Sequence, residues 1–207
     1  MKAVIFLNGN APTPTQIKTA VADANFVLCA DGAFNYLNGI IAPNLILGDF
    51  DSVNGKNFPK DSEIIEFLPE KDYTDGELCV IEAVKRGYNE IEIYGAGGGR
   101  PDHEYANYGL LCRAKQLGAT AKLYIDEWEI TLIDGAVSKE ATIGNYVSMV
   151  PLGEFSHIIR TEGLKYSAHN VSINRAQSLG VSNQAVSKTI AVEVKGETLL
   201  FIQGEKK

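Results

Sequence analysis

The sequence has few of the features that mark secreted or membrane proteins. Its 207 residues include only three cysteines, an odd number with no Cys-x-x-Cys spacing, so nothing favours a disulfide framework. No apolar run approaches the length of a membrane span, and the five apolar residues before Asn8 are too few for a signal peptide. We therefore expect a cytoplasmic protein whose cysteines are buried thiols.

Basic charge is also scarce. Lysine and arginine number 19 against 26 aspartate and glutamate residues, which gives a net charge of -7 and a pI of about 5.0. No cluster of basic residues forms a stripe, so we expect no nucleic-acid or membrane partner. The 45% hydrophobic and 22% charged residues are typical of a globular chain, long enough for one large domain or two small ones.

The first 125 residues alternate strand and helix patterns. Apolar runs predict strands at 3–7, 26–30, 45–47, 64–68, 91–94 and 121–125. Helices are predicted over about 14–22, 75–86 and 102–117, with a short helix after Gly32. This alternation is typical of an α/β fold, in which a mostly parallel sheet is flanked by helices.

Two of the predicted helices carry specific expectations. Asp102 is expected to be the N-cap of the last helix, because a carboxylate there can accept a free backbone N–H. Helical spacing predicts which side chains face the core: Leu78, Ile81, Ala83 and Val84 in the first of the two helices, and Ala106, Leu110, Ala114 and Leu117 in the second.

Beyond about residue 125 the helical signal stops. Short β-rich segments at 128–133, 146–150, 157–160, 190–194 and 198–202 are separated by glycines. They predict a smaller C-terminal antiparallel β-sandwich domain. We place the boundary between an α/β domain of residues 1–127 and a β domain of residues 128–207.

The segment Gly48-Asp49-Phe50-Asp51-Ser52 brings two carboxylates together. In extended backbone after the strand, Asp49 and Asp51 would point the same way. Neighbouring carboxylates repel each other, and Mg²⁺ is an ion that neutralises such pairs beside substrate phosphates. For this segment alone, a solvated turn is the simpler explanation.

Further polar groups also follow predicted strand ends. In parallel α/β sheets, ligands bind beyond the carboxyl ends of the strands. We therefore expect these groups to converge on one rim, whose members are Asp31, Asp49, Asp51, Lys71, Asp72, Asp75 and the glycine-rich loop 95–99.

The loop 95–99 has the composition of a phosphate-binding loop. Its glycines allow backbone N–H groups to approach phosphate oxygens, the following helix N-terminus adds partial positive charge, and Arg100 can bind a phosphate through two N–H groups. It is neither a Walker A motif nor a GxGxxG fingerprint, because the spacing differs. With Asp49, Asp51 and Asp75 as magnesium ligands, the set favours a reaction on a triphosphate.

Taken in order, these motifs resemble those of the thiamin pyrophosphokinase family. They are Ala30-Asp31-Gly32, residues 48–52, Lys71-Asp72-Tyr73-Thr74-Asp75 and residues 95–103, followed in the β domain by Gly163-Leu164-Lys165-Tyr166 and Ser182-Asn183. Each motif is weak alone, but their order over nearly the whole chain is specific. Ala33, Phe34 and Glu162 depart from the family's usual pattern and leave the shape of the pocket open.

The resemblance implies a homodimer that transfers a diphosphate group from ATP to the hydroxyl of thiamin, giving thiamin diphosphate and AMP, with Mg²⁺ as cofactor. It implies catalytic roles for Asp49, Asp51, Asp72 and Asp75, with Asp49, Asp51 and Asp75 as metal ligands. It implies that ATP binds at Asp31, Gly32, Lys71, Gly98, Gly99, Arg100, Asp102 and His103. Thiamin is expected at the dimer interface, beside Tyr166, Ser182 and Asn183.

Simpler roles stay open for several of these residues. Asp31 and Asp102 can serve as helix caps, Lys71 as a solvated lysine and Tyr166 as ordinary sheet packing. We do not expect His103 to bind a metal, because no second histidine or cysteine lies near it in the sequence.

Two other functions share the acidic rim. A diphosphotransferase acting on another acceptor, such as a hydroxymethylpterin, would need the same phosphate chemistry. A non-catalytic nucleotide or vitamin sensor is the second alternative, but such a protein should have lost at least one of the paired carboxylates, and this chain keeps them all.

Overall fold

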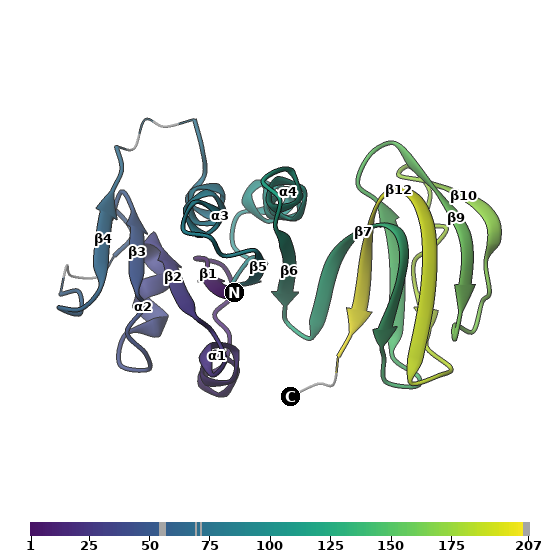
Figure 1. Ribbon diagram of the computed structural model, residues 1–207, viewed down its shortest axis with the longest axis horizontal. Helices are drawn as coiled ribbons and strands as arrows, with labels where there is room; N and C mark the ends of the chain where they lie inside the picture. The colour runs from purple at the N-terminus through teal and green to yellow at the C-terminus, as the bar shows by residue number, and fades with distance from the viewer. Residues whose placement is uncertain (54–56, 69, 71, 205–207) are drawn as a thin grey trace. The chain divides into compact units, whose positions relative to one another are not determined.

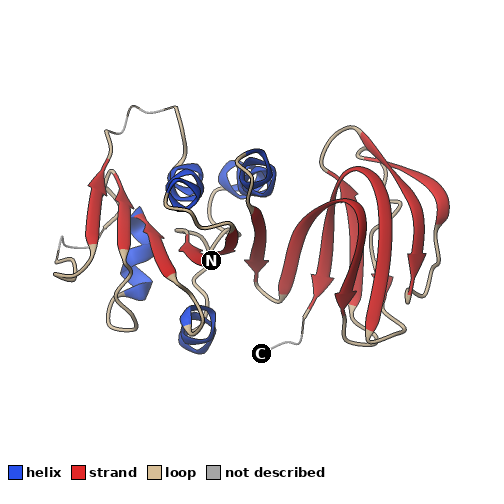
Figure 2. Cartoon of the chain, viewed as in Figure 1, coloured by secondary structure: helices blue, strands red, loops and turns tan. Residues whose placement is uncertain are grey.

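The computed structural model describes residues 1–53, 57–68, 70 and 72–204. It divides into two compact units, Met1–Asp126 and Glu127–Lys207. Within the described residues, every helix belongs to the first unit, and the second contains strands and loops (Figure 2). No helix in the described part of the chain is both long and apolar enough to cross a membrane.

The N-terminal unit is built on a parallel sheet. Its strand order is β6-β5-β1-β2-β3-β4, and each of these neighbouring pairs is parallel. The strands are β1 (Lys2–Phe6), β2 (Phe26–Ala30), β3 (Leu45–Gly48), β4 (Glu63–Glu66), β5 (Glu90–Tyr94) and β6 (Thr120–Ile125).

Helices cover both faces of this sheet. They are α1 (Pro14–Val21), the short 3-10 helix η1 (Asp31–Ala33), α2 (Phe34–Leu37), α3 (Asp75–Lys85) and α4 (Pro101–Gln116). Figure 1 shows α1 and α2 on one face, with α3 and α4 on the other. Because β1, β2 and β3 are buried from both sides, their sequences are continuous apolar runs rather than alternating ones.

The strand order changes direction at β1. From β1 the chain adds β2, β3 and β4 on one side, then returns to place β5 and β6 on the other. Ligand sites of open α/β sheets lie at such switch points, beyond the carboxyl ends of the strands. Here the loops after β1 and β5 are joined by hydrogen bonds, from Gly9 N to Gly95 O at 2.8 Å and from Asn10 N to Gly97 O at 2.7 Å.

The start of α4 differs from the prediction. Asp102 is not the N-cap: Arg100 occupies that position and Pro101 is the first helical residue. Proline suits this position because it lacks the N–H that would otherwise have no partner, and it fixes the helical φ. Asp102 therefore lies in the first turn, where its charge still interacts favourably with the helix dipole.

The predicted buried faces of α3 and α4 are confirmed only in part, at Ala83, Leu110 and Ala114. The buried residues are Gly76, Cys79, Val80 and Ala83 in α3, and Leu110, Leu111 and Ala114 in α4. Ala106 is exposed, and Leu78, Ile81 and Val84 are only half-buried. Both helices pack against each other as well as against the sheet, and this contact shifts the buried stripe.

The C-terminal unit contains only antiparallel pairs among its described strands. These are β7 (Trp128–Glu140), β8 (Tyr146–Pro151), β9 (Phe155–Glu162), β10 (His169–Asn174), β11 (Asn183–Gln184) and β12 (Thr189–Gln203). The predicted fold class, a mostly parallel α/β sheet followed by antiparallel β structure, is confirmed.

Strand β12 is the centre of this unit. It pairs with β7, β8 and β9, and it unites the two strands predicted at 190–194 and 198–202. The register shifts between Val194 and Thr198, where Gly196 has a φ of +97°. This glycine marks an irregularity within one strand rather than a turn between two. The short strands β10 and β11 were not predicted.

Candidate active site

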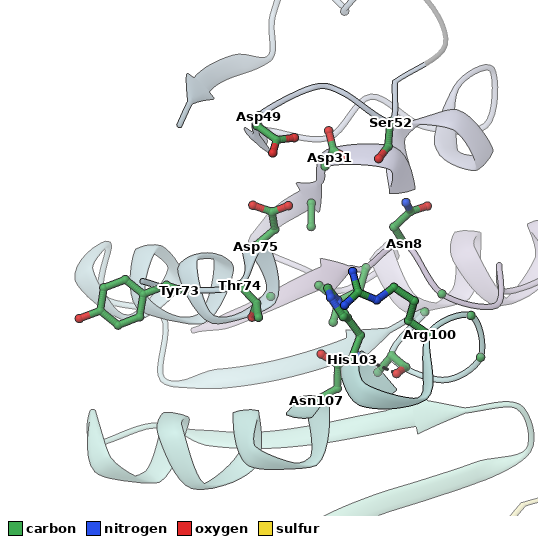
Figure 3. A pocket seen from close by; sticks show the side chains of 18 of the residues that line it. Asn8, Asp31, Asp49, Ser52, Tyr73, Thr74, Asp75, Arg100, His103 and Asn107 are labelled. Carbon is green, nitrogen blue, oxygen red and sulfur yellow. Dashed lines mark hydrogen bonds between the residues drawn. The ribbon is translucent and has the colours of Figure 1, made fainter. Parts of the chain in front are cut away.

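A cavity of about 750 Å³ opens at the carboxyl ends of the parallel strands. It is formed by the loops after β1, β2, β3 and β5 and by the N-terminal ends of α3 and α4, all within the N-terminal unit (Figure 3). The rim predicted from the strand ends is therefore present. Of the predicted site residues it contains Asp31, Asp49, Asp51, Asp72, Asp75, Gly98, Gly99, Arg100 and His103.

Among the described residues, five further predicted site residues do not line this cavity. Gly32 and Asp102 do not line the cavity, although both neighbour residues that do. Lys71 lies outside the described residues. Tyr166, Ser182 and Asn183 belong to the C-terminal unit.

Three carboxylates form a compact cluster. One oxygen each from Asp31, Asp49 and Asp51 lie within 4.8 Å of one another. In Figure 3, Asp75 faces Asp31 and Asp49 from the start of α3. The cluster thus contains Asp31, which was expected to bind ATP. Asp75, which was expected to be a metal ligand, faces the cluster from the start of α3.

The backbone after β3 turns sharply, so the prediction of extended backbone was wrong. Strand β3 ends at Gly48, and Phe50 has a φ of +58°. The Asp51 N–H donates to Asp49 Oδ1 at 3.3 Å, and Ser52 Oγ donates to Asp51 Oδ1 at 2.7 Å. The two carboxylates are therefore brought together by a turn held by its own side chains.

Gly48 lets Asp31 approach the end of β3. A Cβ atom at Gly48 would lie 2.7 Å from the Asp31 Cβ, which is too close for any side chain. Gly48 also has a φ of +154°, which residues with a side chain rarely adopt. Asp31 itself has a φ of +34°, which is unusual for a residue other than glycine. Gly48 therefore makes room for the side chain of Asp31, which lies in η1 directly after the neighbouring strand β2.

The environment of Asp31 disfavours its charged form. Asp31 is only 6% exposed. Burial raises the pKa of its carboxyl group, a hydrogen bond from Ser52 opposes this rise, and the charges of Asp75 and Asp49 add to it. Its Oδ1 atom is buried without a hydrogen-bond partner in the described structure. An unpartnered carboxylate oxygen beside two more carboxylates fits a hard cation such as Mg²⁺.

Asp75 is positioned by a helix cap. Thr74 is the N-cap of α3, and its side chain accepts the Glu77 N–H at 3.2 Å. Asp75 is then the first helical residue and is half-buried. A carboxylate in the first turn is stabilised by the partial positive charge of the helix N-terminus.

Arg100 and Asp102 form an exposed ion pair at the mouth of the cavity. Arg100 Nε and Nη2 lie 3.1 and 2.6 Å from the two carboxylate oxygens of Asp102. The guanidinium lowers the pKa of Asp102 to about 2. Arg100 lines the cavity, whereas Asp102 does not.

The segment around Tyr166 is held by Asn183 in the C-terminal unit. Asn183 is buried, and its Oδ1 accepts N–H groups from Tyr166 at 3.0 Å and Gln184 at 2.9 Å. Its Nδ2 donates to Tyr166 O at 2.7 Å. The Tyr166 ring is exposed, with Lys165 Nζ 5.5 Å from its centroid. Asn183 therefore fixes the backbone that carries Tyr166, and Tyr166 and Ser182 are the accessible members of this set.

Several residues of the site were not singled out from the sequence. Asn8 and Asn107 line the cavity, and Glu104 accepts a hydrogen bond from the glycine loop. For Asn8 a signal existed, because it directly follows the apolar run of β1. Glu104 and Asn107 lie inside a helix, where their spacing alone indicates nothing about a loop that precedes them.

Comparison with known proteins identifies the family. Residues 17–123 match the catalytic domain of thiamin pyrophosphokinase, and residues 136–199 match its vitamin B1 binding domain. A thiamine pyrophosphokinase of Bacillus subtilis (strain 168) is 27% identical over 162 residues, which cover 75% of each chain. Thiamin pyrophosphokinase 1 of Caenorhabditis elegans is 24% identical over 220 residues, covering 97% of this chain and 88% of the relative.

Solved structures share the fold. The crystal structure of thiamine pyrophosphokinase from Bacillus subtilis has a TM-score of 0.86 at 23% identity and covers 99% of this chain and 100% of its own. Yeast thiamin pyrophosphokinase has a TM-score of 0.79 at 19% identity, covering 98% and 85%. Because the catalytic-domain match alone spans more than half of the sequence, the chain belongs to the thiamin pyrophosphokinase family.

Proposed function

We infer that the protein is a thiamin diphosphokinase, which transfers a diphosphate group from ATP to the hydroxyl of thiamin and releases AMP. The observation that carries this inference is the cavity at the switch point, which joins a three-carboxylate cluster to a glycine loop in a chain with both domains of the family. The carboxylates suit a metal–triphosphate complex, and the loop suits its phosphates.

We propose Mg²⁺ as the cofactor, held by Asp31, Asp49 and Asp51, with Asp75 facing the same space. Asp31 replaces Asp75 in the ligand set expected from the sequence, because its buried oxygen lacks a partner. When bound, the ion neutralises the carboxylates and offsets charge on the phosphate oxygens.

In the proposed reaction, the thiamin hydroxyl oxygen forms a bond to the β-phosphorus of ATP. The bond from the β-phosphorus to the oxygen bridging to the α-phosphate breaks, and AMP leaves with that oxygen. Asp75 aligns the hydroxyl and accepts its proton, with the more exposed Asp72 as the alternative. Most of the acceleration comes from positioning and electrostatics.

We propose that ATP is positioned by Gly99, Arg100 and His103, which line the cavity beside the start of α4. A helix N-terminus and a guanidinium both favour phosphate. Roles in ATP binding for Gly32, Lys71, Gly98 and Asp102 stay predictions.

We propose that the C-terminal unit binds thiamin and forms a homodimer. Tyr166 offers an exposed aromatic face that suits the cationic thiazolium ring of thiamin. Further large apolar side chains of the unit are exposed and suit an interface between copies: Phe155, Leu179, Val181 and Val186.

We also propose a cytoplasmic location. The protein needs ATP, and its three cysteines, all within the described part of the chain, form no disulfide. Thiols of this kind fit a reducing compartment.

The reaction is tested by measuring AMP release from ATP and Mg²⁺, with and without thiamin. Thiamin-dependent AMP, formed in step with thiamin diphosphate and abolished by EDTA, is the expected result. AMP without thiamin dependence would point to another acceptor, with hydroxymethylpterins next. ADP would mean single-phosphate transfer, and binding of thiamin without turnover would favour the sensor.

A thiamin site shared between the two chains of a dimer is tested by mixing two variants, each of which should be inactive alone. Asp51→Asn damages the cluster, and Tyr166→Ala damages the proposed thiamin contact. If thiamin sits between two copies, the mixture should recover activity, because some dimers combine an intact cluster with an intact Tyr166 from different chains. Light scattering should show a dimer, and a monomer that is fully active would refute the arrangement.

A further inference from the structure

The glycine loop after β5 is held by two side chains of the helix that follows it. Gly98 N donates to Glu104 Oε2 at 2.8 Å, and Asn107 Nδ2 donates to Ala96 O at 2.8 Å. Asn107 lines the cavity, but Glu104 is not among the lining residues. The carboxylate of Glu104 therefore acts on the loop and does not occupy the space available to phosphates.

Other bonds fix the preceding peptide groups. Gly95 O and Gly97 O accept the N–H groups of Gly9 and Asn10. The carbonyls from Gly95 to Gly97 and the amide of Gly98 are thus all engaged. Gly99 is different, because a Cβ atom added there would meet nothing within 4 Å. The loop is braced up to Gly98 and open from Gly99 onward.

These hydrogen bonds, here called the brace of the loop, matter because glycines lose more backbone entropy than other residues when they become ordered. Gly98 and Gly99 have φ angles of +78° and +75°, one of several regions that glycine populates readily. An unbraced loop would have to be ordered when the ligand binds, and this cost would reduce affinity. A loop ordered in advance avoids that cost.

We propose that Glu104 is a positioning residue for nucleotide binding, whose side chain accepts the Gly98 N–H and holds the loop so that Gly99 and the start of α4 meet the phosphates of ATP. The identity of the ligand rests on the proposed function. The role requires a hydrogen-bond acceptor and not a negative charge, since another charge near the phosphates would disfavour a polyanion.

The test compares Glu104→Ala with Glu104→Gln. The glutamine keeps a carbonyl acceptor for Gly98 N–H, whereas alanine removes it. Loss of the hydrogen bond from Gly98 N–H, with the disorder of the loop that follows, should raise the KM for ATP about tenfold in Glu104→Ala, with kcat changed less. Glu104→Gln should stay close to the wild type. Gln116→Ala, an exposed position on the same helix, is the matched control.

Loop order is measured by hydrogen exchange of peptides covering residues 95–100. Exchange should be faster in Glu104→Ala than in the wild type, while peptides from β1 and β2 stay unchanged. Equal ATP affinity and equal exchange in Glu104→Ala and Gln116→Ala would overturn the proposal. A defect in Glu104→Gln as large as in Glu104→Ala would also overturn it, because the charge would then be the cause.

Two further measurements keep the test decisive. Should Glu104→Ala fail to fold, Asn107→Ala removes the neighbouring brace at Ala96 O and should raise the KM for ATP in the same way. Direct binding of ATP in Mg²⁺ buffer, followed by calorimetry, requires no turnover. It therefore tests the brace even if thiamin is not the acceptor. A failure of the proposed role of Glu104 can then be distinguished from a failure of the proposed function.

Discussion

Asp31 carries a buried carboxylate on a left-handed backbone, and both features cost folding free energy. We therefore expect Asp31→Asn to stabilise the metal-free protein at neutral pH by about 1 kcal/mol, a rise in Tm of about 2–4 °C. Activity should fall at least about 10²-fold. Asp61→Asn, an exposed position outside the cavity, is the control and should change stability by less than about 0.5 kcal/mol.

The pH dependence of this difference has a defined sign. The pKa of Asp31 is higher in the folded protein than in the unfolded chain. The wild type therefore loses stability as the pH rises from the pKa of the unfolded state through the pKa of the folded state. In acid, Asp31 is protonated in both states, so the Tm values of Asp31→Asn and the wild type should agree. The gap should open as pH rises and then level off. A gap that is constant with pH would exclude this cause.

Asp51 lies in the same cluster but is exposed. Asp51→Asn should keep the fold and lower kcat by about 10²–10³-fold, because one metal ligand loses its charge. Circular dichroism checks that the fold is kept, and steady-state kinetics measure the fall in kcat. Near-normal turnover would show that the metal assignment is wrong.

At the residue scale, the sequence predicted that the carboxylates share one rim, but not which of them form the compact cluster. Asp49 and Asp51 could be predicted because they follow an apolar strand directly. That Asp31 joins them depends on a close approach across two strands at Gly48, which no local pattern reveals. The hydrogen bond from Gly98 to Glu104 is likewise a tertiary contact, so Glu104 gave no signal.

Helix α4 contains a glycine that its packing does not require. Gly109 is exposed, its φ is not positive, and a Cβ atom there would meet nothing within 4 Å. Gly109→Ala should therefore stabilise the protein by about 0.5–1 kcal/mol, because alanine loses less conformational entropy in a helix. Thermal unfolding measures this effect, and thiamin diphosphokinase activity should not change. A loss of stability would mean that α4 contacts another surface at this face.

At the element scale, the sequence predicted where strands and helices lie better than where they begin or which way they face. Helix α4 begins at Pro101 and not after Asp102, because proline prefers the first helical position. Gly196 was expected to separate two strands but lies within β12, because a glycine indicates backbone freedom and not whether the strand ends there. Strand β10 was missed because its mostly polar sequence lacks an apolar run.

At the scale of the whole molecule, metal binding should raise the thermal stability of the protein. A ligand that binds only the folded state stabilises it by mass action, by about 2.7 kcal/mol at a concentration 100 times Kd. We expect MgCl₂ to raise the Tm of the wild type, and EDTA to reverse the rise. With a net charge of -7, general screening also has to be controlled, so NaCl at equal ionic strength is the reference. An equal rise in NaCl, or in Asp51→Asn, would contradict a specific metal site.

The position of β1 between β2 and β5 has a consequence for the growing chain. During translation, β1 emerges before the other strands of its sheet and can pair with β2 early, but its other edge stays unpaired until β5 has been translated. Val4, Ile5 and Phe6 are fully buried in the finished protein, so a nascent or truncated chain that stops before β5 exposes an apolar strand with an unpaired edge. Such fragments should aggregate, and the nucleotide pocket is among the last parts of its unit to be completed during synthesis.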